Sequence, residues 1–576
     1  MTEKLTLKKL IIAFAQMNPT VGDIRGNADL IRAARQKAAD AGADLLVTPE
    51  LSLVGYPPED LVLKPELLLE AQAELRALMA ETGDGGPGIL VGAPMPDVKL
   101  QDNPFKKAFT TTGSEIYNAA VLLDGGNLVG WKGKHFLCDY SVFDEKRVFK
   151  QGALTGPFSF RGVRVGVFIC EDMWDSDVCE TLAEAGAEML IGINGSQFNA
   201  GKTDTRQHLA IERIKECDLP LAYLNMVGGQ DDIVFDGGSF VLNADCSLQA
   251  QAPMFDEHFM VTEWAAGSDG IWACAPAQKI APEDELAAIY RALVLGVRDY
   301  IRKNRFPGIV IGMSGGIDSG LSAAIAVDAI GADRVRCVMM PSPYTSKESL
   351  EDAELATELL GVKYDSISIG PAMKAFEEML APVMAGTEAD TTEENIQARS
   401  RGLTLMAISN KLGFMVLSTG NKSEMSVGYA TLYGDMCGGY NALKDVYKTK
   451  VFALSRWRNE NKPDDALGPD GTVMPERIIT KPPSAELKPD QTDQDSLPEY
   501  DVLDGILECL IEEELPLVDI LARGYDESTV RRVWRMLDLA EYKRRQSAPG
   551  VRVTLRDLAR DRRYPITNAF RGLTNR

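Results

Sequence analysis

Residues 308–330 read GIVIGMSGGIDSGLSAAIAVDAI, and this stretch decides the fold of the second half of the chain. Its apolar, β-branched start predicts a strand over 308–312, and its later apolar residues predict a helix over 320–330. Small Gly and Ser residues lie between them. Such a loop can bind an anion, because backbone N–H groups can approach closely and a helix N-terminus carries partial positive charge. The GxxxxGK pattern is missing, which excludes a Walker A loop.

Outward from this stretch, strands and helices alternate. In the second half we expect strands over 334–340, 364–369 and 415–418, and helices over 346–360 and 394–412. In the first half we expect strands over 10–16, 44–48, 89–92, 119–123, 163–170, 189–194, 220–225 and 239–243, and helices over 27–41, 66–82, 176–187 and 205–217. Both halves are therefore predicted to be α/β, and the second to be a doubly wound parallel sheet with ligands at its strand ends.

The length of 576 residues predicts two domains, because one hydrophobic core rarely grows beyond about 300 residues. A turn-rich stretch over 265–282 precedes an expected helix over 283–304. We therefore place the domains at 1–275 and 276–576, with the anion-binding loop at 312–319. A polar stretch rich in Pro and Asp, 459–497, predicts a long loop of functional or mobile character.

The composition limits the classes of partner. There are 61 Lys and Arg residues against 84 Asp and Glu, a net charge of −23 that disfavours a nucleic-acid or membrane role. The nine cysteines form no CxxC pair and there are only three histidines, so a disulfide framework or a His-based metal site is not expected. No segment is apolar for about 18 residues. These features predict a soluble cytoplasmic protein.

Cys170 stands at the end of the expected strand over 163–170, a junction that can present a side chain at a sheet edge. A cysteine attacks as the thiolate, so a nucleophilic role would need a base and a cation nearby. Glu50 and Lys134 follow two other strands and can supply them.

The segments TPEL (48–51), KGKHFLCDYSVFDEKRVF (132–149) and ICEDMW (169–174) resemble the nitrilase superfamily of Glu-Lys-Cys amidases over residues 1–265. The resemblance implies a four-layer α-β-β-α sandwich. It implies Glu50 as general base, Lys134 as the group that stabilises the oxyanion and thiolate, and Cys170 as nucleophile. Glu145 matches a second glutamate that supports the site.

Glutamine is the expected amide substrate. Its ammonium and carboxylate groups need charged or polar partners, and the sequence around the three motifs supplies them. The candidates are Tyr56, Tyr140, Glu171, Ser196 and Lys202. Tyr140, Ser196 and Lys202 match glutamine-binding positions in the glutaminase branch of the superfamily. Cys138 and Gln197 stand where this family usually has Pro.

The string SGGIDS (314–319) resembles the PP-loop of N-type ATP pyrophosphatases, which cleave ATP to AMP and pyrophosphate. The resemblance implies an ATP site at Gly312, Met313, Ser314, Gly315, Gly316, Ile317, Asp318 and Ser319. Asp318 would also be a Mg²⁺ ligand, since carboxylate oxygen suits that ion.

ENIQARSR (394–401), LSTGNKSEMSVGYATLYGD (417–435), DVYKTKV (445–451) and KPPSAEL (481–487) resemble the NAD synthetase family. The resemblance implies further ATP contacts at Thr419, Lys448 and Ser484, and Glu424 as a second Mg²⁺ ligand. It implies deamido-NAD contacts at Asn395, Glu424 and Lys543. Ala442 replaces the usual Pro of this family.

Together the resemblances imply a glutamine-hydrolysing ligase. It would adenylate deamido-NAD with ATP and Mg²⁺, and amidate it with glutamine-derived ammonia to give NAD, AMP and pyrophosphate. L-glutamine, ATP and deamido-NAD would be its small-molecule partners, and a homo-oligomer is expected. The alternatives are another PP-loop amidotransferase, similar to GMP synthetase, and a non-catalytic nucleotide- or glutamine-sensing module.

Overall fold

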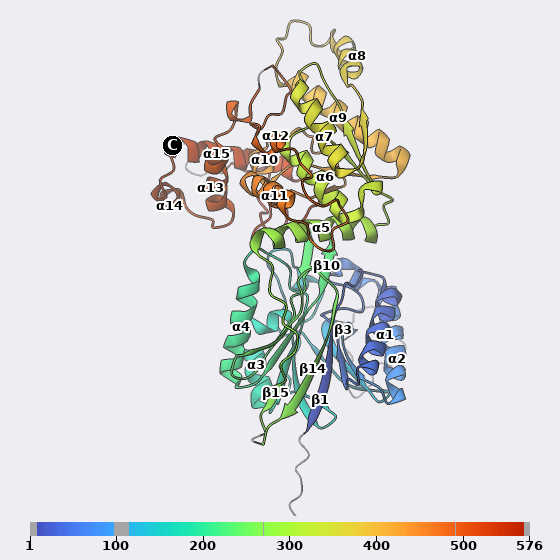
Figure 1. Cartoon of the computed structure of the whole chain (residues 1–576). Helices are drawn as coiled ribbons and strands as arrows, with labels where there is room; N and C mark the ends of the chain where they lie inside the picture. The colour runs from blue at the N-terminus through green and yellow to red at the C-terminus, as the bar shows by residue number, and fades with distance from the viewer. Residues whose placement is uncertain (1–7, 97–114, 269, 490, 570–576) are drawn as a thin grey trace, which may run out of the picture. The chain divides into compact units, whose positions relative to one another are not determined.

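The computed structural model describes residues 8–96, 115–268, 270–489 and 491–569, and the chain divides into two compact units (Figure 1). The first unit contains the described residues up to Gln230 together with Val234–Glu283. The second contains Asp231–Ile233 and the described residues from Asp284 onward.

Two sheets form the centre of the first unit. The strand order of the first sheet is β15 (Trp272–Cys274), β14 (His258–Ala266), β1 (Lys9–Gln16), β2 (Leu45–Val47), β3 (Gly88–Pro96), β4 (Ile116–Asp124), β5 (Asn127–Gly133). That of the second is β13 (Leu248–Gln251), β12 (Phe240–Leu242), β9 (Leu221–Asn225), β8 (Met189–Asn194), β7 (Val163–Ile169), β6 (Phe158–Phe160). The strands β10 (Val227–Gln230) and β11 (Ile233–Asp236) form a separate pair.

Helices cover the outer face of each sheet. Helices α1 (Ile24–Asp40) and α2 (Pro65–Glu81) pack on the first sheet, and α3 (Ser176–Glu184) and α4 (Lys202–Cys217) pack on the second (Figure 1). Apolar side chains from the facing sides of both sheets, such as Val47 and Val167, form one buried core between them. The predicted four-layer α-β-β-α sandwich is confirmed.

The second unit contains a five-stranded parallel sheet with the order β18 (Lys363–Ser366), β17 (Val335–Met339), β16 (Ile309–Gly312), β19 (Met415–Ser418), β20 (Tyr440–Asn441). From β16 the chain adds strands first on one side and then on the other. A ligand crevice is expected where the order reverses, outside the ends of β16 and β19.

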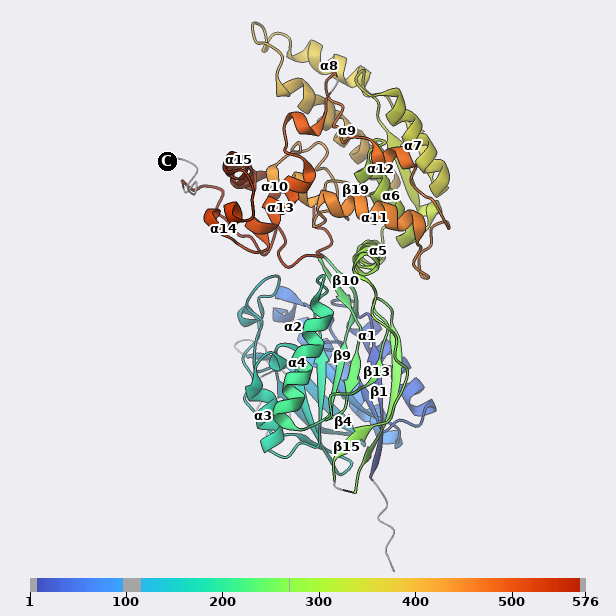
Figure 2. The same ribbon diagram turned by 60° about the vertical axis from the view of Figure 1, so that its left-hand side comes forward.

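The helices of the second unit are α5 (Glu285–Lys303), α6 (Ile317–Ile330), α7 (Lys347–Leu360), α8 (Gly370–Leu380), α9 (Thr391–Leu412), α10 (Lys422–Val427), α11 (Lys448–Glu460), α12 (Glu476–Thr480), α13 (Tyr500–Ile511), α14 (Leu517–Ala522), α15 (Glu527–Leu539) and α16 (Glu541–Arg544). Helix α9 packs on the sheet through Leu405, against Val310 and Val416. Helices α10 and α13 to α15 share a core of their own beside the sheet (Figure 2).

The predicted strands and helices around the two motifs are confirmed within a few residues, and three predictions need correction. The strand expected over 364–369 ends at Ser366. The stretch expected to be turns, 265–282, includes the edge strand β15. The loop expected over 459–497 contains the short helix α12.

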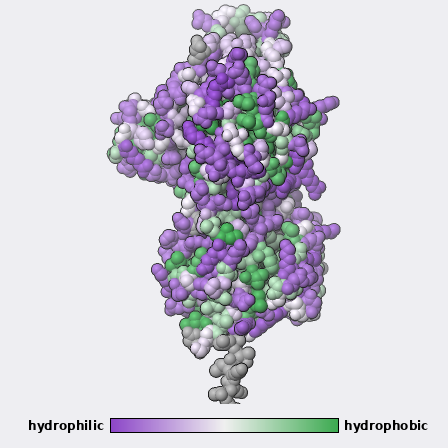
Figure 3. Space-filling view, viewed as in Figure 1, coloured by the Kyte–Doolittle hydropathy of each residue, from purple (hydrophilic) through white to green (hydrophobic). Residues whose placement is uncertain are grey.

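Hydrophilic side chains cover most of the face seen in Figure 3, with apolar residues in smaller patches. Among the helices of the described residues, none is long and apolar enough to cross a membrane. The C-terminal segment from Lys543 onward is described as far as residue 569, and residues 570–576 lie outside the described part of the chain.

Candidate active sites

Cys170 lies at the end of β7, where the strand turns directly into a short 3-10 helix, Cys170–Met173. Its φ is 47°, a left-handed conformation that non-glycine residues rarely adopt and that is enriched at functional sites. The residue is buried. The strand-end position predicted for this thiol is confirmed.

A buried ammonium group lies between two carboxylates of the same unit. Lys134 follows β5, and its Nζ donates to Glu50 Oε1 at 2.8 Å and to Glu145 Oε2 at 2.7 Å. Both Lys134 and Glu50 have no exposed side-chain surface. Removing one partner from such a buried pair typically costs about 3–5 kcal/mol, because the other charge is left uncompensated. The cluster is therefore a fixed part of the fold.

The free site holds Cys170 as a thiol. Burial raises the pKa of Cys170 well above its ordinary value, the charge of Glu50 adds to the increase, and Lys134 opposes it. Burial also raises the pKa of Glu50, against the attraction of Lys134. The charge of Lys134 acts in the direction expected of it, since it favours the thiolate, but in the free site it does not outweigh burial. A protonated thiol near a carboxylate of raised pKa can instead pass its proton to that carboxylate during attack.

Two further groups hold the Glu50 carboxylate. Asn118 on β4 donates from Nδ2 to Oε1 at 2.7 Å, and Gly195 donates from its backbone N–H to Oε2 at 2.8 Å. A side chain at position 195 would collide with the ring of Tyr56, since a Cβ there would lie 2.7 Å from Tyr56 Cδ1. The glycine lets this backbone donor approach the carboxylate.

Cys138 contributes a backbone hydrogen bond. Its N–H donates to Glu145 Oε2 at 2.9 Å, and its Sγ lies 3.6 Å from Lys134 Nζ. A proline has no N–H and could not make the first contact. The cysteine at this position therefore adds a contact to the Lys134 cluster.

The predicted glutamine-binding residues fall into two groups. Tyr56 is buried and donates to Glu145 Oε1 at 3.3 Å. Tyr140 is about half exposed, and its hydroxyl donates to the carboxylate of Glu171 at 2.8 Å. Because Glu171 is the neighbour of Cys170 in sequence, this pair lies beside the nucleophile.

Ser196 lies on the segment that leads into α4, and Lys202 is the first residue of that helix. Ser196 Oγ accepts from Arg206 Nε at 3.1 Å, and Arg206 also pairs with Asp236 at 2.7 Å. The ammonium group of Lys202 lies 5.9 Å from the ring centre of Trp174, in the range of a cation–π contact.

Asn118 and Arg206 belong to these clusters but were not among the predicted site residues. A polar residue inside the apolar run of β4 was a signal for Asn118. Arg206 had none, because an arginine on an amphipathic helix is normally solvated, whereas this one is buried.

In the second unit, the loop between β16 and α6 is closed by its own serines. Ser314 N–H donates to Ser319 Oγ at 3.2 Å, and Gly316 N–H donates to Ser314 Oγ at 3.2 Å. Gly315 has a φ of +78°, and a Cβ there would lie 2.3 Å from the carbonyl oxygen of Ser349. The loop therefore packs against α7 as only a glycine allows.

This loop opens on a cavity of about 280 Å³ at the switch point of the sheet. Of the predicted ATP contacts, the cavity is lined by Gly312, Met313, Ser314, Gly315, Gly316, Ile317, Asp318, Ser319, Thr419, Lys448 and Ser484. Glu424 also lines it, as do apolar side chains such as Met340 and Leu405. The structure thus brings these separated motifs together.

Lys448 joins the two predicted metal ligands. Its Nζ donates to Asp318 Oδ2 at 2.5 Å and contacts Glu424 Oε1 at 3.2 Å. Asn421 Nδ2 donates to Asp318 Oδ1 at 2.8 Å. Burial raises the pKa of Glu424 to about 8, while Lys448 opposes this and Asp318 reinforces it. The cluster faces the cavity.

Asn395 and Lys543 are not among the described residues that line this cavity. Both contact one neighbouring segment instead. Asn395 Oδ1 accepts from Thr431 Oγ1 at 2.9 Å, and Lys543 Nζ donates to the carbonyl oxygens of Gly428 and Ala430 at 2.7 and 2.6 Å.

The chain matches two family models: Carbon-nitrogen hydrolase over residues 11–266 and NAD synthase over residues 289–547. It is 49% identical over 560 residues to the glutamine-dependent NAD(+) synthetase of Rhodobacter capsulatus, covering 97% of this chain and 98% of that protein. It is 44% identical to the one from Acinetobacter baylyi, covering 98% and 99%. A solved structure of the Acinetobacter baumannii synthetase with ADP has a TM-score of 0.74 and 41% identity, covering 97% of this chain and 99% of that chain.

Proposed function

Because this chain belongs to the family of glutamine-dependent NAD(+) synthetases, we propose that the cluster around Lys134 is its glutaminase site and the cluster around Lys448 its NAD-forming site. The chain is a glutamine-hydrolysing ligase that converts deamido-NAD and ATP to NAD, AMP and pyrophosphate. Its full-length relatives favour this function over the GMP-synthetase-like alternative. Assembly as a homo-oligomer stays a prediction.

In the glutaminase site, Cys170 attacks the amide carbonyl of glutamine while Glu50 accepts the thiol proton. Lys134 stabilises the negative oxygen of the tetrahedral intermediate. Glu50 returns the proton to the departing ammonia, and water then hydrolyses the thioester with Glu50 again acting as base. The buried Glu50–Lys134 contact at 2.8 Å is the observation that carries this assignment.

In the second site, the carboxylate of deamido-NAD attacks the α-phosphorus of ATP and pyrophosphate leaves. Ammonia then attacks the resulting acyl adenylate, displaces AMP and gives up a proton as the amide forms. Lys448 would neutralise charge on the phosphates, and the PP-loop N–H groups would hold them.

The two carboxylates beside Lys448 suit Mg²⁺. That ion is usually bound by one or two carboxylates with nucleotide phosphates and water as the other ligands. Within the described residues, no group of three or more His, Cys, Asp or Glu side chains is arranged to hold a metal by itself. Asp318 and Glu424 would therefore share the ion with the phosphates of ATP, and the ion would offset their negative charge.

The pH dependence of glutamine hydrolysis tests the role of Glu50. A base works only when unprotonated, so kcat/KM is expected to rise with pH as Glu50 loses its proton, above the usual range for glutamate. Glu145→Gln removes a negative charge that disfavours the Glu50 anion. It should move this rise to lower pH, by roughly one unit.

The matched control is Glu263→Gln, at an exposed position on β14 of the same unit, which should leave the profile in place. The role of Glu50 as the base would be contradicted if kcat/KM of the wild type rose in the usual pH range of a glutamate. It would also be contradicted if the pH of this rise were the same in Glu145→Gln.

Lys543 is proposed to support deamido-NAD binding, and Lys543→Ala tests this. The change removes the cation that holds the carbonyl groups of Gly428 and Ala430. The KM for deamido-NAD should rise about tenfold, the worth of one charged hydrogen bond, while the Kd for ATP stays constant. Lys462→Ala, which breaks a surface ion pair with Asp470, should change neither value. An unchanged KM in Lys543→Ala would leave Lys543 a structural residue only.

A further inference from the structure

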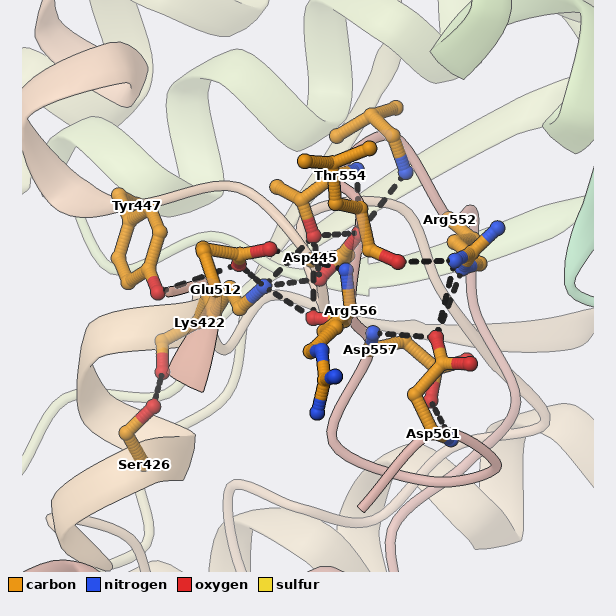
Figure 4. Close-up of polar contacts among 12 residues, drawn as sticks. Lys422, Ser426, Asp445, Tyr447, Glu512, Arg552, Thr554, Arg556, Asp557 and Asp561 are labelled. Carbon is orange, nitrogen blue, oxygen red and sulfur yellow. Dashed lines mark hydrogen bonds and ion pairs between the residues drawn. The ribbon is translucent and has the colours of Figure 1, made fainter. Parts of the chain in front are cut away.

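Lys422 is a buried cation that the proposed reaction does not use. Its side chain has no exposed surface, and its Nζ lies 2.7 Å from Asp445 Oδ1 and 2.5 Å from Glu512 Oε1. It also donates to Thr554 Oγ1 and to the carbonyl oxygen of Arg556, each at 2.7 Å (Figure 4). Burying such a cluster is costly, and apolar residues of similar volume often serve stability equally well. Its presence therefore needs another explanation.

The position of Lys422 in the chain offers an explanation for this buried cluster. It is the first residue of α10, between the N-cap residue Asn421 and Glu424. Asn421 Oδ1 accepts from the backbone N–H of Glu424 at 3.0 Å, and Asn421 Nδ2 donates to Asp318. The helical turn that Lys422 anchors thus carries Glu424, which lines the nucleotide cavity, and Asn421, which contacts the cavity residue Asp318.

Asp445, a carboxylate partner of Lys422, also lies close in sequence to a residue of the proposed site. Asp445 lies three residues before Lys448, and the backbone N–H of Lys422 donates to the carbonyl oxygen of Val446 at 2.9 Å. One ion pair therefore ties together the two chain segments that carry Glu424 and Lys448.

The C-terminal segment closes the cluster from the other side. Asp445 Oδ2 accepts from the backbone N–H groups of Val553 and Thr554, each at 2.8 Å. Glu512 Oε2 accepts from Arg556 N–H at 2.9 Å (Figure 4). With these contacts in place, the carboxylates of Asp445 and Glu512 are both paired and hydrogen-bonded.

We propose that Lys422 is a positioning residue for the NAD-forming site: its cluster with Asp445 and Glu512 fixes the first turn of α10 so that Asn421 and Glu424 meet Asp318 and Lys448. This inference rests on the proposed role of Glu424 as a ligand of nucleotide-bound Mg²⁺.

The test measures ATP binding by calorimetry over a range of Mg²⁺ concentrations. In Lys422→Met the Mg²⁺ concentration needed for half-maximal ATP binding should rise about 10–100-fold, as when the support of a metal ligand is lost. Thr554→Val removes the hydroxyl that accepts from Lys422 Nζ and donates to Asp445, and it leaves all charges, so it should give a rise of about fivefold. Thr554→Val decides the question if Lys422→Met does not fold.

A control separates positioning from stability. Val533→Ala removes a buried side chain from the core of the same helical part and should lower the melting temperature without changing the Mg²⁺ requirement. If folded Lys422→Met and Thr554→Val behave like Val533→Ala, the inference is overturned.

A double-variant comparison tests whether Lys422 acts through Glu424. Glu424→Gln alone should raise the Mg²⁺ requirement, and adding Lys422→Met should change it less than about twofold further. If the two substitutions raised the Mg²⁺ requirement independently, so that their fold-changes multiplied in the double variant, the inference would be contradicted. If Glu424→Gln itself leaves the requirement unchanged, the proposed metal role falls, and this inference with it. If Glu424→Gln raises the Mg²⁺ requirement but Lys422→Met and Thr554→Val leave it unchanged, the metal role of Glu424 stands and only the inference about Lys422 is overturned.

Discussion

Cys170→Ala is expected to lose glutamine-dependent NAD formation by about 10⁴-fold or more, the usual effect of removing a nucleophile. Glu50 and Lys134 cannot replace it, because neither can form the thioester. Ammonia-dependent synthesis should survive at high ammonium and alkaline pH, since the nucleophile of the second site is ammonia itself. Both rates are measured as NAD formed from deamido-NAD and ATP.

Cys179→Ala is the matched control, since Cys179 on α3 is also buried in the first unit but has no place in the proposed site. It should use both nitrogen sources. If Cys170→Ala still used glutamine, the glutaminase assignment would be wrong. If a folded Cys170→Ala lost both activities, the two sites would not be chemically separable.

Asp318→Ala is expected to abolish NAD formation from either nitrogen source. The variant loses a carboxylate from the cavity and a partner at 2.5 Å from Lys448. The developing charge on the phosphates would then lack an ordered counter-charge, and kcat should fall by about 10²–10³-fold or more. Glu424→Ala should have the same effect, because it removes the other proposed Mg²⁺ ligand. Activity is followed with glutamine and with ammonia in parallel.

Asp333→Asn provides the comparison, because Asp333 is an exposed carboxylate just beyond the end of α6. It should keep full activity. Near-normal synthesis from ammonia in Asp318→Ala or Glu424→Ala would refute the metal assignment for that residue.

The parts of the molecule that follow from local chemistry could be predicted from the sequence. The strand before Cys170 is apolar from Val165 to Ile169, and acidic residues follow Cys170 directly. The loop over 312–319 combines small residues with a strand and a helix on either side. In both cases the pattern that specifies the backbone also places the reactive group.

The remaining parts depend on contacts between distant segments. Lys422 and Thr554 are 132 residues apart in sequence, and nothing near either one predicts the other. The same holds for Asn118 and Glu50, which are 68 residues apart. The edge strand β15 was missed because its three residues lie in a stretch with a turn-like composition.

The most direct test of the two-site account is one incubation of the purified wild-type chain with ATP, Mg²⁺, deamido-NAD and glutamine labelled with heavy nitrogen in its amide. Mass spectrometry then follows the label, and the adenine nucleotides are counted. The account predicts labelled NAD and AMP in equal amounts, with the label in the nicotinamide amide. NAD without the label, or ADP in place of AMP, would contradict it.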